Sequence, residues 1–265
     1  MQRAERLIRL TQLMMERPLH AISLASLAEQ WGVAKSSLSE DVATIRQTIA
    51  DAERGTVETL VGVQGGVRLR SGVPTDERVT FLNNLARTLS EPGRVLPGDF
   101  VYMSDVLGDP YVLDTVGRLV AMQFADKAVN VVVTVETKGI TLATATARHL
   151  NVPIAIVRRD QRVTEGAAIS THYVSGSTRR IQTMSLGKRA MPSEACALIV
   201  DDFMRAGATA RAVVDLLKEF SAEVVGTAVF MATSQPTTKM VNDYFTLLRV
   251  HEVSEHGANV QPALT

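Results

Sequence analysis

Two adjacent acids follow a short apolar stretch late in the chain, and a loop of small residues comes directly after them. Residues 197–200 predict a buried strand, and the loop predicts a tight turn that opens a helix. Paired acids can accept hydrogen bonds from ribose hydroxyls or bind a hydrated Mg²⁺, while N–H groups at a helix N-terminus bind phosphate. The pattern therefore predicts a ribose-phosphate site made of Asp201, Asp202, Phe203, Met204, Arg205, Ala206, Gly207, Ala208 and Thr209.

A second polar loop follows an earlier strand-like stretch. Residues 129–135 are mostly apolar and β-branched, which is typical of a strand buried on both faces. Thr137, Lys138 and Gly139 follow and could bind a pyrophosphate. Because ligands bind at the carboxyl ends of strands in an open α/β sheet, we expect the two loops to lie together. The loop at 201–209, with the strand before it, resembles the signature of the type I phosphoribosyltransferases, which bind phosphoribosyl pyrophosphate (PRPP). The loop at 137–139 suits the pyrophosphate.

The first loop departs from the usual transferase pattern at two positions. Ala206 stands where many of these enzymes have threonine, and Ala208 stands where they have a second glycine. Loss of the hydroxyl weakens phosphate binding, and a Cβ at a position that needs positive φ adds strain. Ala208 therefore puts the affinity for PRPP in doubt, but not the fold.

Three helices are predicted near the start of the chain. Apolar residues at helical spacing indicate helices over 3–16, from Ser23 onward, and over 35–53. Gly32 supplies a tight turn between the second and third. Two helices joined by a short glycine turn match the helix-turn-helix motif.

A β-hairpin is predicted next. Strands at 57–63 and 67–70 flank Gly65 and Gly66. Helices followed by such a hairpin, or wing, form a winged helix, whose third helix enters the DNA major groove while the wing reaches the neighbouring backbone. The residues expected to contact DNA are Lys35, Ser36, Ser37 and Ser39 at the start of the third helix, Arg46 further along it, and Arg68 and Arg70 in the wing.

The charge of this segment leaves a second interpretation open. Residues 1–72 contain nine Lys and Arg against eight Asp and Glu, so we expect modest electrostatic attraction to DNA. Winged helices also serve as docking or dimerisation modules. Asp41, within the third helix, could simply pair with a basic side chain of the same domain.

The rest of the chain predicts an α/β fold. A strand at 129–135 is followed by a helix ending near Leu150 and then by another strand, and the same order repeats later in the chain. Two βαβ units of this kind imply a parallel sheet with helices on its faces. The further expected elements are helices around 81–89 and 112–124, strands at 153–157, 197–200 and 223–230, and a helix over 208–220.

Two further segments lie outside the helices and strands of this α/β pattern. Residues 158–189 form a basic insertion with strands expected near 167–174 and 180–186, which could fold over a polyanion or be an ordinary surface hairpin. Its cations are Arg158, Arg159, Arg162, Arg179, Arg180, Lys188 and Arg189. Residues 251–265 are expected to be a weakly structured tail.

Composition limits the class of protein. The 265 residues carry a formal net charge of zero, and the single cysteine, Cys196, cannot form an internal disulfide. No transmembrane-length apolar run or signal peptide is evident, which predicts a soluble cytoplasmic protein without a membrane partner. No histidine or cysteine spacing suits zinc, and no catalytic triad can be nominated, so neither a metal ligand nor a catalytic residue is assigned.

The chain as a whole resembles the purine operon repressors of Gram-positive bacteria, in which a winged helix is fused to a phosphoribosyltransferase-like domain. The similarity runs almost end to end. The segments that carry it are 137–140, 150–153, 163–166, 173–177, 180–186 and 199–204.

This resemblance implies a winged-helix domain over 1–72 and an effector-binding domain over 73–265. It implies a homodimer that binds operator DNA upstream of purine genes, with PRPP as effector held in an enzyme-like site without turnover. The sequence leaves open whether Mg²⁺ is needed and whether a purine nucleotide competes with PRPP. Asp201 and Asp202 would take the ribose hydroxyls, residues 205–209 the 5-phosphate, and residues 137–139 the pyrophosphate. Tyr102, Phe203 and Arg205 would close over the base side.

Two other functions remain open from the sequence. The chain could be an active purine phosphoribosyltransferase with an appended domain, or its winged helix could dock a protein. "Regulator" is safer than "repressor", because the sequence does not give the sign of the response.

Overall fold

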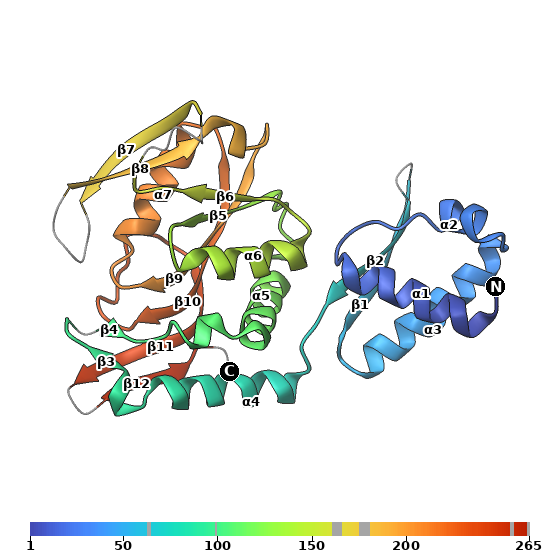
Figure 1. Cartoon of the computed structure of the whole chain (residues 1–265), viewed down its shortest axis with the longest axis horizontal. Helices are drawn as coiled ribbons and strands as arrows, with labels where there is room; N and C mark the ends of the chain where they lie inside the picture. Colours follow the sequence, from blue (N-terminus) through green and yellow to red (C-terminus); the bar gives the residue numbers. More distant parts are fainter. Residues whose placement is uncertain (63–64, 99, 161–165, 175–180, 255–256, 264–265) are drawn as a thin grey trace.

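The computed structural model describes residues 1–62, 65–98, 100–160, 166–174, 181–254 and 257–263. Figure 1 shows a small helical unit with a two-stranded wing and a larger α/β unit, joined through a helix along one side. Among the described residues, no helix has both the length and the apolar character needed to span a bilayer.

The small unit is a winged helix, as predicted. It consists of α1 (Arg3–Glu16), α2 (Leu24–Trp31), α3 (Lys35–Asp51), β1 (Gly55–Leu60) and β2 (Gly66–Ser71). The two strands pair antiparallel. Positions 63 and 64, which the predicted hairpin includes, lie outside the described residues.

Local signals fix the ends of these helices. The Ser23 hydroxyl accepts a hydrogen bond from the Ser26 N–H and caps α2. Gly32 ends α2 with φ 63°, a left-handed conformation that a side chain would strain. Leu10 and Met14 of α1 are fully buried against Ile45 of α3 and the wing, so apolar packing holds the motif together.

The connection between the two units is short. Strand β2 ends at Ser71 and α4 (Thr75–Leu89) begins four residues later, so the linker between the two units is three residues long. The Gly72 N–H donates to the Arg54 carbonyl, and the Arg54 guanidinium pairs with Glu77. The first turn of α4 is therefore tied to the end of the winged helix.

The large unit is built on a six-stranded sheet in the order β12-β11-β10-β9-β5-β6. All neighbouring strands are parallel except the edge pair β11 and β12. The strands are β5 (Val131–Val135), β6 (Ile154–Val157), β9 (Cys196–Met204), β10 (Glu223–Thr233), β11 (Tyr244–Ser254) and β12 (Gly257–Pro262).

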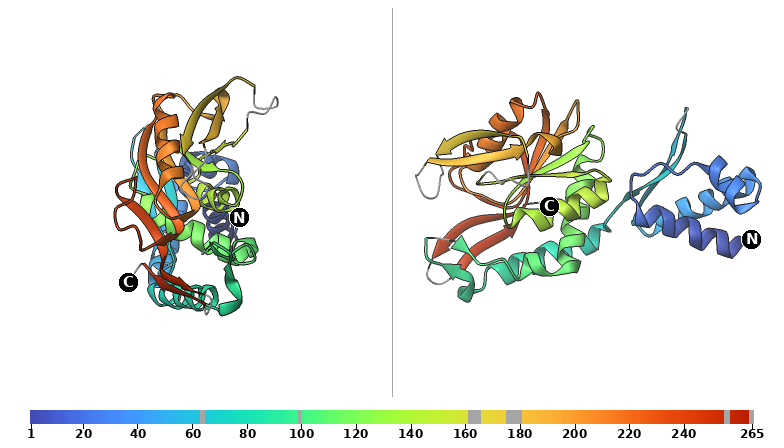
Figure 2. Two further views of the ribbon diagram at one scale, coloured as in Figure 1. Left: turned by 90° about the vertical axis from the view of Figure 1, so that its left-hand side faces the viewer. Right: turned by 45° about the horizontal axis from the view of Figure 1, so that its top comes forward.

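Helices cover both faces of this sheet. The helices α5 (Pro110–Phe124) and α6 (Gly139–Leu150) lie on one face, and α7 (Ala208–Lys218) lies on the other (Figures 1 and 2). Successive residues of the central strands alternate between the two cores, with Leu198 and Val200 on the α5–α6 side and Ile199 on the α7 side. Burial on both faces explains why these strands are continuously apolar.

The basic insertion forms the expected hairpin. Strands β7 (Ala168–Val174) and β8 (Ile181–Gly187) pair antiparallel beside α7. Arg162, Arg179 and Arg180 lie outside the described residues.

The prediction of a weakly structured tail is wrong. Residues up to Ser254 complete β11, and Gly257–Pro262 form β12 at the sheet edge. Ala258 and Val260 are buried at alternating positions against α4, and the Val260 N–H donates to the Ser90 hydroxyl. This period-two pattern is short and polar on its other face, so it gives only a weak signal in the sequence.

Candidate functional site

The predicted ligand loops meet at one cleft. Strands β5 and β9 are neighbours in the sheet, and the loops that follow them line a cavity of about 830 Å³ at their carboxyl ends. All of the predicted effector residues line this cavity except Tyr102 and Gly139. The geometric expectation that the two loops lie together is therefore confirmed.

Residues Arg205–Thr209, here termed the phosphate loop, lead from β9 into α7. Gly207 has φ 86° and precedes the first helical residue, Ala208. In the described part of the chain, the N–H groups of residues 206–209 donate no hydrogen bond to the protein. Unpaired N–H groups at the start of a helix provide an anion-binding surface.

The strain expected at Ala208 is not present. The position with positive φ is Gly207, which is still glycine, and Ala208 is not among the residues with positive φ. The prediction assigned the left-handed conformation to the wrong residue, because the sequence alone does not show where the turn ends and the helix begins.

The acidic pair lies beside this loop. Asp201 Oδ1 accepts a hydrogen bond of 2.9 Å from the Asp202 N–H. Burial of the carboxyl group, together with the negative charge of Asp202, raises the pKa of Asp201 well above its usual range, and the positive charge of Arg159 opposes this shift. A cation or a set of hydroxyl donors would relieve the repulsion between the two acids.

The loop after β5 is packed against the acids. A Cβ at Gly139 would lie 3.1 Å from Asp201 Oδ1 and closer still to the Thr134 hydroxyl, so only glycine fits there. Gly139 also begins α6, next to Lys138 and Thr137, which face the cavity. Gly139 therefore permits the close approach of the two loops, although it does not line the cavity itself.

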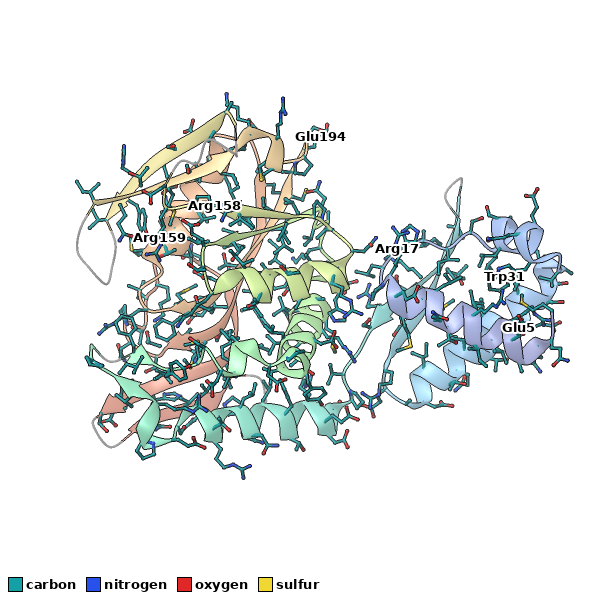
Figure 3. All side chains as sticks on the ribbon, in the orientation of Figure 1. Glu5, Arg17, Trp31, Arg158, Arg159 and Glu194 are labelled. Carbon is teal, nitrogen blue, oxygen red and sulfur yellow. The ribbon has the colours of Figure 1, made fainter. Side chains whose placement is uncertain are left out.

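Glu136 joins this loop to the insertion. Its carboxylate accepts a 2.7 Å hydrogen bond from the Arg159 N–H and pairs with the Arg158 guanidinium at 3.3 Å. Figure 3 shows both arginines where the chain leaves β6. Arg159 lines the cavity and brings a second cation to the site.

The cavity has an apolar side that sequence reasoning missed. Strands β3 (Val95–Leu96) and β4 (Phe100–Val101) form a small hairpin, and its apolar side chains also line the cavity. Tyr102 follows this hairpin and is 43% exposed, without lining the cavity. Each strand has only two residues, which is too short to show any periodicity. The lining residues of this side are Leu96, Pro97, Phe100, Val101 and Met103.

The predicted DNA-contacting residues divide into two groups. Lys35, Ser36 and Ser39 lie exposed on the first turns of α3, and Ser37 is partly exposed. The Ser39 hydroxyl donates to the Lys35 carbonyl, so it is available to a ligand only as an acceptor or after rotation. This end of α3 presents a polar surface to solvent.

The arginines of α3 and the wing already have partners. Arg46 donates to the Val57 carbonyl at 2.9 Å and to the Thr59 hydroxyl, which fastens α3 to β1. Arg68 and Arg70 both pair with Glu58, at 2.6 and 2.9 Å. Their positive charges are therefore partly neutralised within the wing.

Arg70 also reaches the large unit. Its guanidinium lies 2.7 Å from the Asp126 carboxylate, beyond the end of α5, and hydrogen bonding to Asp126 is the main cause that raises the pKa of Arg70. A residue predicted to contact DNA thus takes part in a contact between the two units.

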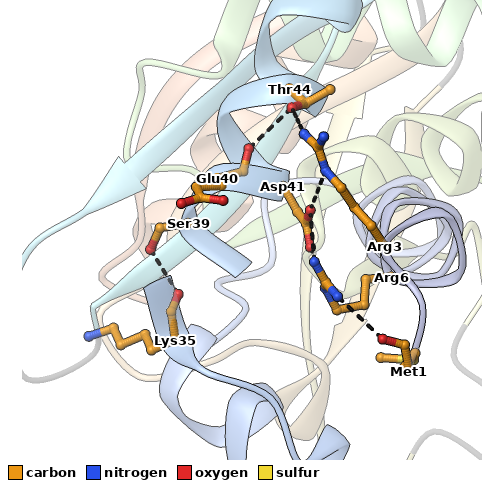
Figure 4. Close-up of polar contacts among 8 residues, drawn as sticks. All are labelled: Met1, Arg3, Arg6, Lys35, Ser39, Glu40, Asp41 and Thr44. Atoms are coloured by element: carbon orange, nitrogen blue, oxygen red, sulfur yellow. Dashed lines mark hydrogen bonds and ion pairs between the residues drawn. The ribbon is translucent and has the colours of Figure 1, made fainter. Parts of the chain in front are cut away.

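Asp41 has the structural role that the sequence allowed. Its side chain is fully buried, and the Arg6 guanidinium approaches both of its oxygens, at 2.6 and 3.3 Å. Arg3 lies 3.4 Å from the same carboxylate and donates to the Thr44 hydroxyl (Figure 4). These contacts fix α1 against α3, beside the surface predicted to meet DNA.

Comparison with known families accounts for both units. Residues 2–71 match the family described as "Bacterial purine repressor, N-terminal", and residues 104–264 match the "Phosphoribosyl transferase domain". Among solved structures, adenine phosphoribosyltransferase from Thermoanaerobacter pseudethanolicus covers 63% of this chain and 99% of its own, with a TM-score of 0.55 and 17% identity. That likeness shows the fold of the large unit.

Curated relatives extend over nearly the whole chain. The purine biosynthesis transcriptional repressor PurR of Bacillus subtilis is 44% identical over 98% of this chain and 91% of its own. The purine biosynthesis transcriptional activator PurR of Lactococcus lactis subsp. lactis is 38% identical over 96% of this chain and 93% of its own. With both units matched in one continuous alignment, the chain belongs to the PurR family of bacterial purine repressors.

Proposed function

We propose that this protein is a DNA-binding transcription regulator of purine biosynthesis genes, and that its large domain senses PRPP without catalysing a reaction. The observation that carries the proposal is the cleft, in a chain that also has a winged helix: it is lined by the paired acids and by residues 206–209, whose N–H groups donate no hydrogen bond within the described part of the chain.

Each part of PRPP has a matching group in this cleft. The N–H groups of the phosphate loop and the Thr209 hydroxyl would bind the 5-phosphate, and Asp201 and Asp202 would bind the ribose hydroxyls. Lys138 and Arg159 would neutralise the pyrophosphate. The acids also offer the oxygen ligands that Mg²⁺ prefers, and a bound Mg²⁺ would neutralise further phosphate charge.

The apolar side of the cavity supports a competing nucleotide. PRPP has no base, so it leaves the hairpin formed by β3 and β4 without a partner. Phe100 is 44% exposed at this rim and could stack on a purine ring. A purine nucleotide that fills this side while its phosphate occupies the phosphate loop would exclude PRPP.

The absence of turnover is part of the proposal. Phe203 lines the cavity beside the acids and packs against the α5–α6 core, which limits the space for an attacking base next to the ribose. Incubation with PRPP and guanine, xanthine, hypoxanthine or adenine is therefore expected to release no pyrophosphate. Release of pyrophosphate with any of the four bases would instead favour an active transferase. A distant relative, the xanthine phosphoribosyltransferase of Agathobacter rectalis, is named for that activity and is 29% identical over 56% of this chain.

The direction of the response is left open by the relatives. The Bacillus subtilis protein is named a repressor and the Lactococcus lactis protein an activator. In either case, PRPP can change the affinity for DNA only if the protein, most simply a homodimer, has two states and PRPP binds one of them more tightly than the other.

Calorimetric titration with PRPP and Mg²⁺ tests the effector site. Wild-type protein is expected to bind saturably, and Asp202→Asn to bind at least tenfold more weakly because it loses charged acceptors for the ribose hydroxyls. Asp215→Asn, which changes a partly exposed acid on α7 of the same domain, is the matched control and should bind like wild type. Absence of saturable binding by the wild type would contradict PRPP sensing.

A further inference from the structure

A buried lysine lies beneath the phosphate loop. Lys239, in the connection between β10 and β11, is only 8% exposed although lysine is rarely buried. Burial, the larger cause, and the charge of Arg249 lower the pKa of Lys239. A cation in such a place needs compensating hydrogen bonds.

The ammonium group of Lys239 has an acceptor for each of its protons. It donates to the Arg205 carbonyl, to the Thr233 carbonyl at 2.7 Å and to the Thr233 hydroxyl at 3.1 Å. A lysine ammonium has three donors, so none is left for a ligand. Any effect of Lys239 on binding must therefore pass through the loop.

The neighbouring residue makes a second contact with the same loop. The Met240 N–H donates to the Ala206 carbonyl at 2.8 Å. The Thr233 hydroxyl also lies 3.2 Å from the Arg205 carbonyl. The two carbonyl groups that precede Gly207 are thus both turned toward the β10–β11 connection.

The direction of these carbonyls fixes the direction of two donors. The peptide bonds between Arg205 and Ala206 and between Ala206 and Gly207 are trans, since neither is among the cis bonds of the described chain. In a planar trans peptide the N–H points opposite to the C=O. The Ala206 N–H therefore points away from the Lys239 ammonium group, and the Gly207 N–H points away from the Met240 N–H. Ala206 and Gly207 both line the cavity.

We propose that Lys239 is the positioning residue of the phosphate loop: it holds the Arg205 carbonyl and, with Met240, turns the Ala206 and Gly207 N–H groups toward a bound 5-phosphate. This inference rests on the proposed function, and it adds a residue from the β10–β11 connection, 34 positions after Arg205 in the chain. Lys239 acts on the conformation of the phosphate loop before the ligand binds, and it does not act through direct charge attraction to the ligand.

Lys239→Met tests the inference, because it keeps the apolar stem and removes the donors. Calorimetry would compare ribose 5-phosphate, which needs the loop, with pyrophosphate, which is assigned to residues 137–139, and with PRPP and Mg²⁺. We expect roughly tenfold weaker binding of ribose 5-phosphate and PRPP, and pyrophosphate affinity within twofold of wild type. Lys218→Met, an exposed lysine at the end of α7, is the matched control and should change none of the three affinities.

A second, milder variant separates a loss of loop positioning from a general folding defect. Thr233→Val keeps the shape of the side chain and removes one acceptor of Lys239, so it should show a smaller loss with the same ligand pattern. Unchanged ribose 5-phosphate affinity in Lys239→Met, or equal losses for all three ligands in both variants, would overturn the inference.

The two proposals fail in different ways. If wild type binds ribose 5-phosphate but not PRPP, PRPP sensing fails, and the role of Lys239 is still decided by ribose 5-phosphate. If wild type binds PRPP, and Lys239→Met binds each of the three ligands with the same affinity as wild type, only the positioning role of Lys239 fails. If wild type binds neither sugar phosphate, both are overturned.

Discussion

Asp201 is an acid whose surroundings oppose its ionisation. Its carboxyl is buried next to Asp202, and the raised pKa means that the folded, unliganded protein binds a proton there more tightly than the unfolded chain does. Stability from this proton is therefore present below the usual pKa of an aspartate and is lost as the pH rises through the raised value. The protein retains a destabilising acid where a ligand would need it.

Asp201→Asn is expected to stabilise the unliganded protein and weaken the binding of PRPP. The amide oxygen can still accept from the Asp202 N–H, and at neutral pH no charge has to be buried. We expect the melting temperature to rise by a few degrees at pH 8, about what 1 kcal/mol produces in a domain of this size. The difference from wild type should shrink as the pH falls, and a difference that grows toward low pH would contradict this account.

Ala208→Gly is expected to change PRPP affinity by less than twofold. Ala208 is the first residue of α7 and has no positive φ, so an added glycine relieves no strain. The measurement is the same calorimetric titration, with Gly207→Ala as a comparison, because Gly207 at φ 86° does require glycine. A large gain in affinity from Ala208→Gly would show that the alanine does weaken the site.

The residues that would contact the ligand could be predicted from the sequence, but the cations that the fold brings to the two loops could not. Acids and small residues next to a strand are visible in the sequence, whereas Arg159 and Lys239 are ordinary cations until the fold brings them to the loops. Lys239 reaches the Arg205 carbonyl only through the pairing of β10 with β9. No local pattern could have indicated that contact.

Helix α3 depends on a buried ion pair for its position. Asp41 lies on the face that packs against α1, where Arg6 is only 13% exposed. Removing one partner of a buried pair leaves the other charge uncompensated, which costs more than the pair itself contributes.

Asp41→Asn is expected to lower the free energy of unfolding of the winged helix by roughly 3 kcal/mol. Trp31, the single tryptophan of the chain, packs against the core of this unit and would report its unfolding in urea by fluorescence (Figure 3). Asp51→Asn, an exposed acid at the end of α3, is the control and should have little effect. Equal midpoints for Asp41→Asn and wild type would contradict the assigned role.

The wing carries an internal restraint on DNA binding. Glu58 pairs with both Arg68 and Arg70, so its single negative charge partly neutralises them. Glu58→Gln is expected to raise affinity for random-sequence DNA several-fold at low salt and to steepen the logarithmic salt dependence by about one, because one more arginine contacts phosphate. Anisotropy titrations at several salt concentrations measure this, with Glu16→Gln at the end of α1 as the charge-matched control. Equal salt dependence in the Glu58→Gln and Glu16→Gln variants would contradict contact between the wing arginines and DNA phosphates.

Long periodic segments were predictable as elements, and short or edge segments were not. The helices of the winged helix and the two βαβ units have apolar faces of several turns or continuous buried strands. Strands β3 and β4 have two residues each, and β12 is recognised only by its pairing with β11 and the cover of α4. Tertiary contacts, rather than local propensity, stabilise these elements.

The two units of the molecule contact each other near the wing. Arg70 bridges to Asp126, and between the units lies a cleft of about 1020 Å³, lined by α1 and α3 on one side and by Asp114, Arg118 and His149 on the other. The three-residue linker, the Arg54–Glu77 pair and the Arg70–Asp126 pair join the two units. This arrangement provides a physical route from effector to DNA, if PRPP favours one orientation over another.

The proposed function requires that PRPP binding change the affinity of this chain for DNA. The most direct measurement is fluorescence anisotropy with DNA from upstream of purine genes, titrated with the protein at fixed salt, with and without saturating PRPP and Mg²⁺. We expect tighter binding than to random DNA and a change of at least several-fold in affinity when PRPP is present. An affinity for this DNA that is no higher than for random DNA, or that is identical with PRPP bound, would contradict it.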